Sequence, residues 1–470
     1  MNLWQRKLLA FLHDPPHKAL DIPGHEEARD TFIRQAGFAD ASLIREADKI
    51  ADWTGAAADR SLWMSSGLRS PFGGAEHPFL HPMGGSELPV AVPPTPEILA
   101  ETLQTIQHYA QSLENIPVED RDRVNFFLHW RRWAVDAAKI DARCLYQPAD
   151  TRIPDHSIWQ HNGIVSALQG CVDESGSLRP AFLLFQLGPV QEFIAQARST
   201  RDLWSGSYLL SWLVAHAIKA VTDAVGPDSV VFPFLRAQPL YDLLHRDEIY
   251  RKVPYQGKDG RQETLWDRMK AHEREMLIPN LPNRFLALVP AGRAAELGAA
   301  AEKAVRNELA KVGDAIWSWM VSHMGATPEW RGRYDAQVLA FPQLSWQASP
   351  WTENADEAIA ELARHDPPAA RGIEALRRLS SGQPNTGFAW PAHYAHVDRA
   401  LAARRNLRDF QAWPRDEHSS GAVKDSMSGR EEAMGGEAWW NAIRESTDER
   451  VRRLFRSSDR LGAVNLVKRI

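Results

Sequence analysis

The clearest hydrophobic pattern in the chain is a short apolar run followed by a change of period. Residues 182–187 are apolar at nearly every position, which is typical of a strand buried on both faces. Gly188 and Pro189 end this run, because proline lacks an amide donor and fixes its own φ. After Val190 the apolar residues recur at helical spacing, with an irregularity expected over 199–206. The pattern predicts a strand, a tight turn and a long amphipathic helix, which open a βαβ-type unit.

Further apolar segments continue this unit toward the C-terminus. The long helix is expected to end near Gly226, and 236–276 has the charged, mixed character of an insertion. The remaining predicted segments are strands at 229–234, 283–289 and 335–346 and a helix at 291–320. The order β-α-β-β-α-β predicts a ferredoxin-like domain over 178–350, which is the palm fold of nucleotide polymerases and cyclases.

The regions on either side of this unit have mainly helical periodicity. Residues 1–170 predict an all-α domain with helices at 3–12, 42–60, 96–115 and 119–140, and with a loop insertion rich in glycine and proline at 63–101. Residues 351–470 are also mostly helical, with a loose segment near 416–436. The predicted fold class is therefore α+β, with more than one domain in 470 residues.

Composition and charge narrow the function classes. The net charge of −5 excludes a globally basic nucleic-acid binder, so any such binding depends on local patches. Two cysteines, Cys144 and Cys171, cannot form a disulfide framework or a CxxC metal clip. No run of about eighteen apolar residues is present, so we expect a cytoplasmic protein without a membrane partner.

The first helix leads into an adjacent His-Asp pair, His13 and Asp14, and Pro15 stops it. Such a pair at a helix end is the core of HD-type metal phosphohydrolases, where imidazole nitrogen and carboxylate oxygen bind one divalent ion. Asp48 and Asp52 lie four residues apart on the second helix and share a face. For Asp52 we expect a solvated position on that face.

Several longer strings resemble one protein family. The segment Gly188–Tyr208, with its Arg201-Asp-Leu-Trp-Ser-Gly-Ser-Tyr string, resembles the first palm domain of the large subunit of type III-B (Cmr) CRISPR effector complexes, a member of the Cas-ten family. The string His13-Asp-Pro-Pro-His-Lys-Ala-Leu20, followed by Gly24-His25-Glu26, resembles the HD domain of the same subunit. The segments 148–161, 281–285 and 400–410 also resemble it.

This resemblance implies a circularly permuted HD domain. The implied metal ligands are His13, Asp14, Asp48 and His161, and His25 is a candidate ligand for a second ion. Asp155 and His156 are candidates for outer partners that orient the ligands. Lys18 could offset the charge of a phosphate. The implied reaction is cleavage of single-stranded DNA with manganese, nickel or another divalent transition ion.

The resemblance also implies a nucleotide half-site on the palm, where Gln191 and Ser207 are candidate ATP contacts. The family's active second palm carries Gly-Gly-Asp-Asp, and no Asp-Asp dipeptide occurs in this chain. We therefore expect no cyclic oligoadenylate synthesis from this chain alone, and we expect either a fragment or a second palm on a separate chain.

Near its C-terminus the family usually shows two Cys-x-x-Cys pairs that form a zinc ribbon. The corresponding positions here are Asp425, Ser428, Gly462 and Asn465. Without thiolates we expect no structural zinc. We expect the apolar face of Trp439, Trp440, Ile443, Val451, Leu454 and Phe455 to replace the metal by packing against the palm or a partner domain.

The sequence as a whole is read as the N-terminal half of a Cmr-type large subunit. The expected partners are other Cmr subunits, crRNA, target RNA and single-stranded DNA. Two alternatives stay open: a non-catalytic scaffold that anchors crRNA and neighbouring subunits, and a free-standing HD phosphohydrolase of nucleotides. The predicted palm argues against the last.

Overall fold

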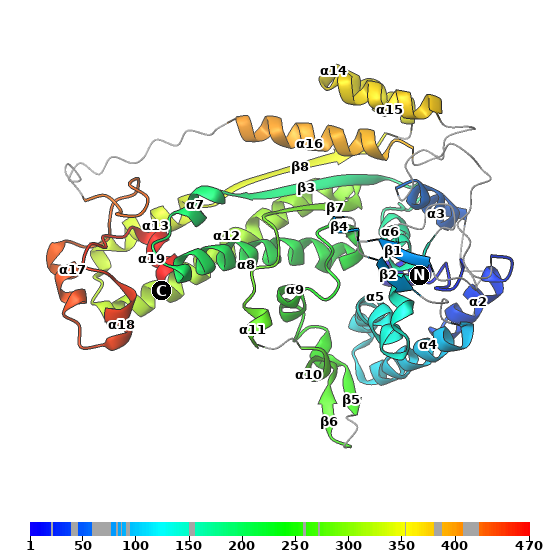
Figure 1. The fold of residues 1–470 in the computed structure, drawn as a ribbon, viewed down its shortest axis with the longest axis horizontal. Coiled ribbons are helices and arrows are strands. Elements are labelled where there is room, and N and C mark those ends of the chain that lie inside the picture. The colour runs from blue at the N-terminus through cyan, green and yellow to red at the C-terminus, as the bar shows by residue number, and fades with distance from the viewer. Residues whose placement is uncertain are drawn as a thin grey trace.

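The computed structural model (Figure 1) is elongated, with helices of the N-terminal region at one end, a central sheet, and the last three helices of the chain, within 437–469, at the other end. It describes residues 1–19, 22–38, 46–58, 77–80, 83–85, 87–90, 95–149, 156–256, 260–270, 273–352, 354–379, 388–407 and 423–470.

The central element is a four-stranded antiparallel sheet in the order β4-β7-β3-β8. Its strands are β3 (Pro180–Gly188), β4 (Val230–Phe232), β7 (Arg284–Pro290) and β8 (Gln343–Pro350), and its two long helices are α8 (Thr200–Val225) and α12 (Ala294–Met324). The chain order β3-α8-β4-β7-α12-β8 is the predicted ferredoxin-like order.

Alternate residues of the strands bury opposite faces of the sheet, as the period of two requires. Leu183 and Phe185 belong to the large core that includes α8 and α12. Phe182 and Leu184 pack with residues of α6 (Ile158–Gln169) and α16 (Trp390–Asn406) on the other face. The prediction of a strand buried on both faces is confirmed.

The predicted fourth strand is wrong in its first half. Residues from Arg331 to Ala340 form helix α13, and β8 begins only at Gln343. Tyr334 and Val338 lie four residues apart and are both buried, and the Tyr334 hydroxyl donates to the Gly313 carbonyl at 2.9 Å. Pro342 separates the helix from the strand, because proline cannot continue a helical hydrogen-bond pattern.

The irregularity expected in the first palm helix is present. Helix α7 (Gln191–Ala195) stops after little more than a turn, and α8 begins at Thr200. Ser199 caps α8 through a hydrogen bond from the Asp202 amide to its hydroxyl. As predicted, α8 ends at Gly226, which has a positive φ of 97°.

The N-terminal region is helical around one central helix. Its helices are α1 (Leu3–Phe11), α2 (His25–Gln35), α3 (Glu46–Ala58), α4 (Pro96–Gln111), α5 (Val118–Ile140) and α6. Phe126, Phe127 and Trp133 of α5 are fully buried. Helix α2 was not expected from the pattern. Within the predicted loop insertion the structure describes a hairpin of β1 (His77–Leu80) and β2 (Glu87–Val90), and most of the remaining insertion lies outside the described residues.

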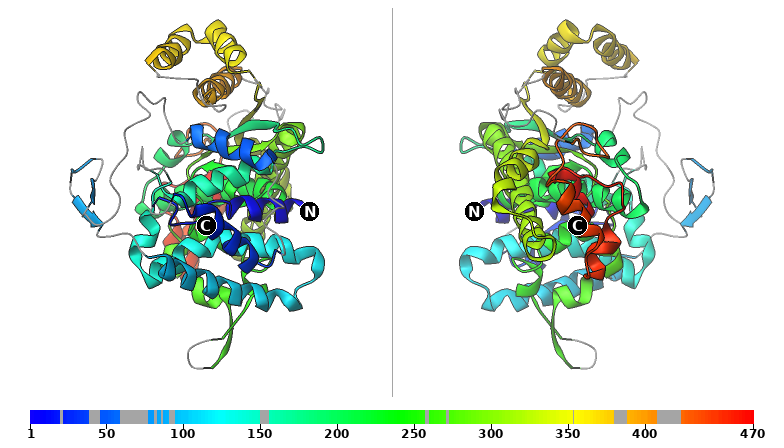
Figure 2. Two further views of the ribbon diagram at one scale, coloured as in Figure 1. Left: turned by 90° about the vertical axis from the view of Figure 1, so that its right-hand side faces the viewer. Right: turned by 90° about the vertical axis from the view of Figure 1, so that its left-hand side faces the viewer.

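The predicted insertion after β4 contains several short elements. They are α9 (Pro239–Leu244), β5 (Pro254–Gln256), β6 (Gln262–Thr264), α10 (Leu265–Met269) and α11 (Glu273–Met276). Short 3-10 turns connect elements throughout the chain at Ser112–Asn115, Ala142–Tyr146, Pro227–Ser229, Tyr250–Lys252, Ala291–Arg293 and Pro328–Trp330. Figure 2 shows the β5–β6 hairpin projecting from the body. On the opposite side, α14 (Ala355–His365) and α15 (Pro367–Leu379) form a separate layer.

The C-terminal third is helical, as predicted. It contains α14 (Ala355–His365), α15 (Pro367–Leu379), α16, α17 (Glu437–Arg444), α18 (Glu449–Leu454) and α19 (Ala463–Arg469). The Trp439 indole donates to the Met324 carbonyl at the end of α12 and packs edge-on against Trp330. The predicted apolar face of α17 and α18 therefore packs against the palm. Among the described helices, none has the length and apolar character needed to cross a bilayer.

Candidate metal centre

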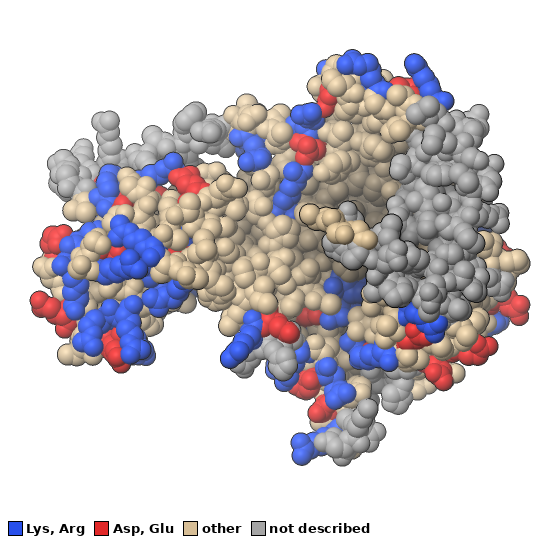
Figure 3. All heavy atoms as spheres, viewed as in Figure 1, with Lys and Arg blue, Asp and Glu red and all other residues tan. Residues whose placement is uncertain are grey.

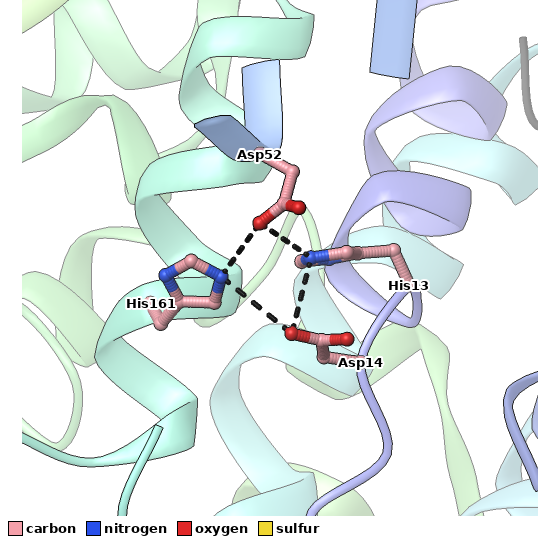
Figure 4. A group of neighbouring side chains, drawn as sticks. All are labelled: His13, Asp14, Asp52 and His161. Carbon is pink, nitrogen blue, oxygen red and sulfur yellow. Dashed lines mark hydrogen bonds and ion pairs between the residues drawn. The ribbon is translucent and has the colours of Figure 1, made fainter. Parts of the chain in front are cut away.

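Four side chains from three separate parts of the chain meet in the N-terminal region (Figure 4). His13 and Asp14 follow α1, Asp52 belongs to α3, and His161 belongs to α6. Each offers one nitrogen or oxygen atom, and these four atoms all lie within 4.8 Å of one another. The predicted convergence of His13, Asp14 and His161 is therefore present, although 147 residues separate Asp14 from His161.

The His13 ring is held with one nitrogen directed into the cluster. Its Nδ1 lies 2.8 Å from the Ala10 carbonyl, which can only accept, so Nδ1 carries the proton and Nε2 keeps its lone pair. Nε2 is buried without a hydrogen-bond partner, 3.4 Å from Asp14 Oδ2 and 3.5 Å from Asp52 Oδ1. A lone pair aimed at two carboxylates is the arrangement of a metal ligand oriented by its other nitrogen.

Asp52 and His161 complete the cluster from two packed helices. His161 Nε2 lies 3.1 Å from Asp52 Oδ1 and 3.6 Å from Asp14 Oδ2. The expectation that Asp52 is solvated is wrong, because its carboxylate contacts both histidines. Asp48 lies one turn earlier in α3, but its side chain is outside the described residues, so its role as a ligand stays a prediction.

The spacing of α3 and α6 explains why Asp52 reaches the cluster. Gly55 packs against Val165, where an added Cβ would come within 3.0 Å of a Val165 methyl carbon. Asp52 precedes Gly55 by three residues, and His161 precedes Val165 by four, so both pairs lie on the faces that meet. The glycine marks the face of α3 that packs on α6, but the sequence offers both Asp48 and Asp52 on that face.

The electrostatics of the two carboxylates favour their charged forms. Burial would raise the pKa of Asp14, but His13, Lys18 and His161 outweigh it and lower that pKa. Burial likewise opposes the ionisation of Asp52, but the adjacent imidazoles of His13 and His161 outweigh it and lower that pKa. Lys18 forms an ion pair with Asp14 and keeps its side chain a quarter exposed. The site therefore presents two anionic oxygens beside two imidazoles.

This donor set fits a divalent transition ion. Two imidazole nitrogens and two carboxylate oxygens suit zinc, manganese, iron or nickel rather than calcium or magnesium, which prefer oxygen alone. The unpartnered Nε2 of His13 is the atom that a cation would satisfy.

The other predicted residues of the HD region lie outside this cluster or outside the described chain. His25 is half-buried at the start of α2, with Nδ1 near the Ile22 carbonyl, and it does not belong to the described group of four. Asp155 falls outside the described residues. His156 precedes α6 and lines a separate cavity.

The candidate ATP contacts lie at the palm. Gln191 is exposed in the first turn of α7, and the Ser207 hydroxyl donates to the Leu203 carbonyl within α8 at 3.0 Å. Their predicted role in nucleotide binding stays a prediction.

The four positions of the degenerate zinc ribbon do come together, around a carboxylate. Asp425 is 2% exposed, and its Oδ1 accepts hydrogen bonds from the amides of Met427 and Ser428 at 2.6 and 2.8 Å. Its Oδ2 accepts from the Gly462 amide at 2.6 Å and from Asn465 Nδ2 at 3.1 Å. Asp425 therefore connects the two segments that contain these four positions.

Comparison with known proteins gives consistent relatives. The family described as "CRISPR-associated protein Cmr2, N-terminal" matches residues 182–314. A curated Cmr subunit Cmr2 of Pyrococcus furiosus is 27% identical over 368 residues, which is 68% of this chain and 39% of the relative. The Cmr2 subunit of Saccharolobus solfataricus is 28% identical over 159 residues, covering 32% of this chain and 15% of the relative.

Solved structures show the same fold. A chain of type III-B Cmr-beta in the apo state superposes with a TM-score of 0.69 at 15% identity, covering 99% of this chain and 49% of that one. Type III-B Cmr-beta bound to cognate target RNA gives 0.58 at 16% identity, covering 99% and 48%. The chain spans about half the length of these solved chains. The expected resemblance is thus confirmed, and the chain is related to the N-terminal part of the Cmr2-type large subunits of type III-B CRISPR systems.

Proposed function

We propose that this chain is the HD- and palm-bearing part of the large subunit of a type III-B Cmr complex, and that its HD centre cleaves single-stranded DNA with a divalent metal ion. The observation that carries the proposal is the cluster of His13, Asp14, Asp52 and His161, whose four ligand atoms lie within 4.8 Å of one another. The relationship to Cmr2-type subunits supports a phosphodiester in a nucleic acid as the substrate.

In this proposal the four cluster residues would hold the ion. A divalent ion there would lower the pKa of a bound water and polarise the phosphodiester. Lys18 lies at the edge of the centre, paired with Asp14, and its ammonium group offsets charge on a phosphate oxygen. Asn162 donates from Nδ2 to the Asp14 carbonyl at 2.9 Å and so holds the backbone beside the ligand. The chain's own contribution is to position the four ligand atoms and to keep the two carboxylates ionised.

The remaining parts of the proposal concern assembly. Other Cmr subunits, crRNA and target RNA are the proposed partners, in keeping with the solved relatives that carry the same fold with and without target RNA. The palm would supply Gln191 and Ser207 to one ATP, with the Gly-Gly-Asp-Asp palm supplied outside these 470 residues.

The test is cleavage of a labelled single-stranded DNA by the purified chain and by the assembled complex, with manganese or nickel added. We expect product that is lost with Asp14→Asn and with His161→Ala, while both variants still assemble. Assembly with full RNA binding but without metal binding or cleavage would instead support the non-catalytic scaffold.

A further inference from the structure

A cavity of about 560 Å³ lies behind the metal centre, between α6, α16 and the segment that follows β4. Its volume is within the range of roughly 300–1,000 Å³ that is usual for small-molecule sites. Among its lining residues are Trp130, Gly163, Phe234, Arg236, Trp390 and Tyr394. Figure 3 shows the molecular surface hollowed below the region of α14 and α15, whereas exposed basic side chains gather at the far end over α17 and α18.

Arg236 is the cation of this cavity. Its Nε donates to the Trp130 carbonyl at 2.9 Å, and its guanidinium carbon lies 5.8 Å from the Trp130 ring centre and 5.4 Å from that of Phe234. Among the described residues no carboxylate lies within ion-pair distance of it. Burial, together with the charge of Arg131, lowers the pKa of Arg236 to about 9. Because no described carboxylate pairs with Arg236, its two terminal nitrogens remain available to an anion.

Asp228, the carboxylate among the described lining residues, does not compete for Arg236. Asp228 is paired with the buried ammonium of Lys7 at 2.8 Å. Burial raises the pKa of Asp228, although Lys7 opposes that shift. Among the described lining residues, the cavity consequently combines the Arg236 guanidinium, which has no ion-pair partner there, with walls that are largely apolar.

Aromatic rings form much of these walls. Trp130, Trp159 and Phe182 are buried in the lining, whereas Phe234 and Tyr394 are 50% and 45% exposed. Half-exposed rings beside a guanidinium group offer a stacking surface and an anion contact together. Proteins that hold unpaired nucleotides use the same two elements, since every base has a flat face and carries a phosphate nearby.

We propose that this cavity binds one nucleotide, with the base against the aromatic wall and the phosphate on Arg236. The shared chemistry is a flat heteroaromatic ring joined to a phosphate, supplied either by a free nucleotide or by an unpaired residue of a strand. Helix α6 carries His161 toward the metal centre and Gly163 toward the cavity, so the two sites flank one helix. The proposal stands without the cleavage reaction proposed above.

The test measures binding of AMP, adenosine, inorganic phosphate and a short single-stranded DNA by calorimetry, with the full chain and no added metal. We expect AMP to bind more tightly than adenosine or phosphate alone. Arg236→Gln and Phe234→Ala should each lower the affinity for AMP about tenfold, because the first removes a charged contact and the second removes a stacking contact. Phe232→Ala is the matched control, because Phe232 is 52% exposed but does not line the cavity.

The outcomes distinguish a free nucleotide from a strand as the ligand, and they distinguish binding in the cavity from binding at the metal centre. Tighter binding of the oligonucleotide than of AMP identifies a strand as the source, and equal binding identifies a free nucleotide. Thermal unfolding of each variant checks that it is folded. The proposal is overturned by absence of AMP and oligonucleotide binding, by binding that folded Arg236→Gln and Phe234→Ala leave unchanged, or by binding that His13→Ala abolishes.

Discussion

The cluster around His13 and the segment around Asp425 differ in how their buried polar atoms are satisfied. In the HD cluster, His13 Nε2 is buried without a hydrogen-bond partner and the carboxylates are directed at imidazoles. Around Asp425, four donors fill both carboxylate oxygens. A buried lone pair without a donor costs free energy unless a cation or water takes it, whereas a filled carboxylate has no such need.

This contrast shows that hydrogen bonds to one buried carboxylate can connect two segments at positions where the resemblance leads us to expect thiolates and zinc. Structural zinc in small modules contributes on the order of 10 kcal/mol of apparent folding free energy. Here Asp425 connects the two segments by hydrogen bonds, and Trp439 of α17 packs on the end of α12 and on the 3-10 turn Pro328–Trp330. Residues 423–470 accordingly contain the helices α17, α18 and α19. Residues 408–422 lie outside the described chain.

The largest expected effect is on metal affinity. The wild-type chain should bind about one equivalent of manganese or nickel, and His13→Ala or Asp14→Ala should weaken that binding more than about 100-fold, because each removes a ligand and not merely a supporting partner. Asp425→Ala is the control and should leave the affinity unchanged. Elemental analysis and titration calorimetry measure both. Stoichiometric metal that remains in His13→Ala and Asp14→Ala but is lost in Asp425→Ala would place the metal site at Asp425 and not at the cluster around His13.

The next effect is on stability at the C-terminal end. Asp425→Ala should destabilise this region by about 2 kcal/mol, because four donors lose their buried acceptor. Glu449→Ala removes only an exposed ion pair with Arg453 and should cost less than about 1 kcal/mol. Hydrogen exchange at the Gly462 amide and urea unfolding followed by tryptophan fluorescence measure the difference. Equal destabilisation by the two variants would show that the hydrogen bonds of Asp425 do not stabilise the C-terminal region.

A smaller effect is expected from the spacing of α3 and α6. Gly55→Val should press on Val165, move Asp52 away from His161 and weaken metal binding about tenfold, while the ligands themselves remain. Gly372→Val, in α15, has open space around its Cβ position and should leave metal binding unchanged. Undiminished affinity in folded Gly55→Val would mean that Asp52 is not a ligand.

The smallest effect is a pH dependence at α19. Burial lowers the pKa of Lys468 to about 8 from its ordinary value of 10.5. The folded state therefore releases this proton before the unfolded state does, and stability should rise with pH between about 8 and 10.5. Comparing urea midpoints of the wild type and Lys468→Met from pH 7 to 10 isolates this contribution. Parallel midpoints for the two proteins across that range would exclude it.

The sequence by itself determined the local elements and their order. Apolar period gave the β3 strand, the broken α7–α8 helix and most of the βαββαβ order, because burial of one face fixes a period over a few residues. The His-Asp pair of His13 and Asp14 also needs only adjacent positions. The error at 335–346 arose where a helix and a strand share one short segment, which periodicity cannot separate.

The tertiary structure alone decided which distant atoms meet. Asp48 and Asp52 share a face of α3, and only the packing of α3 on α6, with Gly55 against Val165, brings the Asp52 carboxylate to His161. The four donors of Asp425 come from its own turn and from the start of α19, and Gly462 follows Asp425 by 37 residues. Arg236 acquires its aromatic surroundings only when α5 packs beside the segment after β4. Such contacts depend on packing between elements, and a sequence pattern reports only the period within each element.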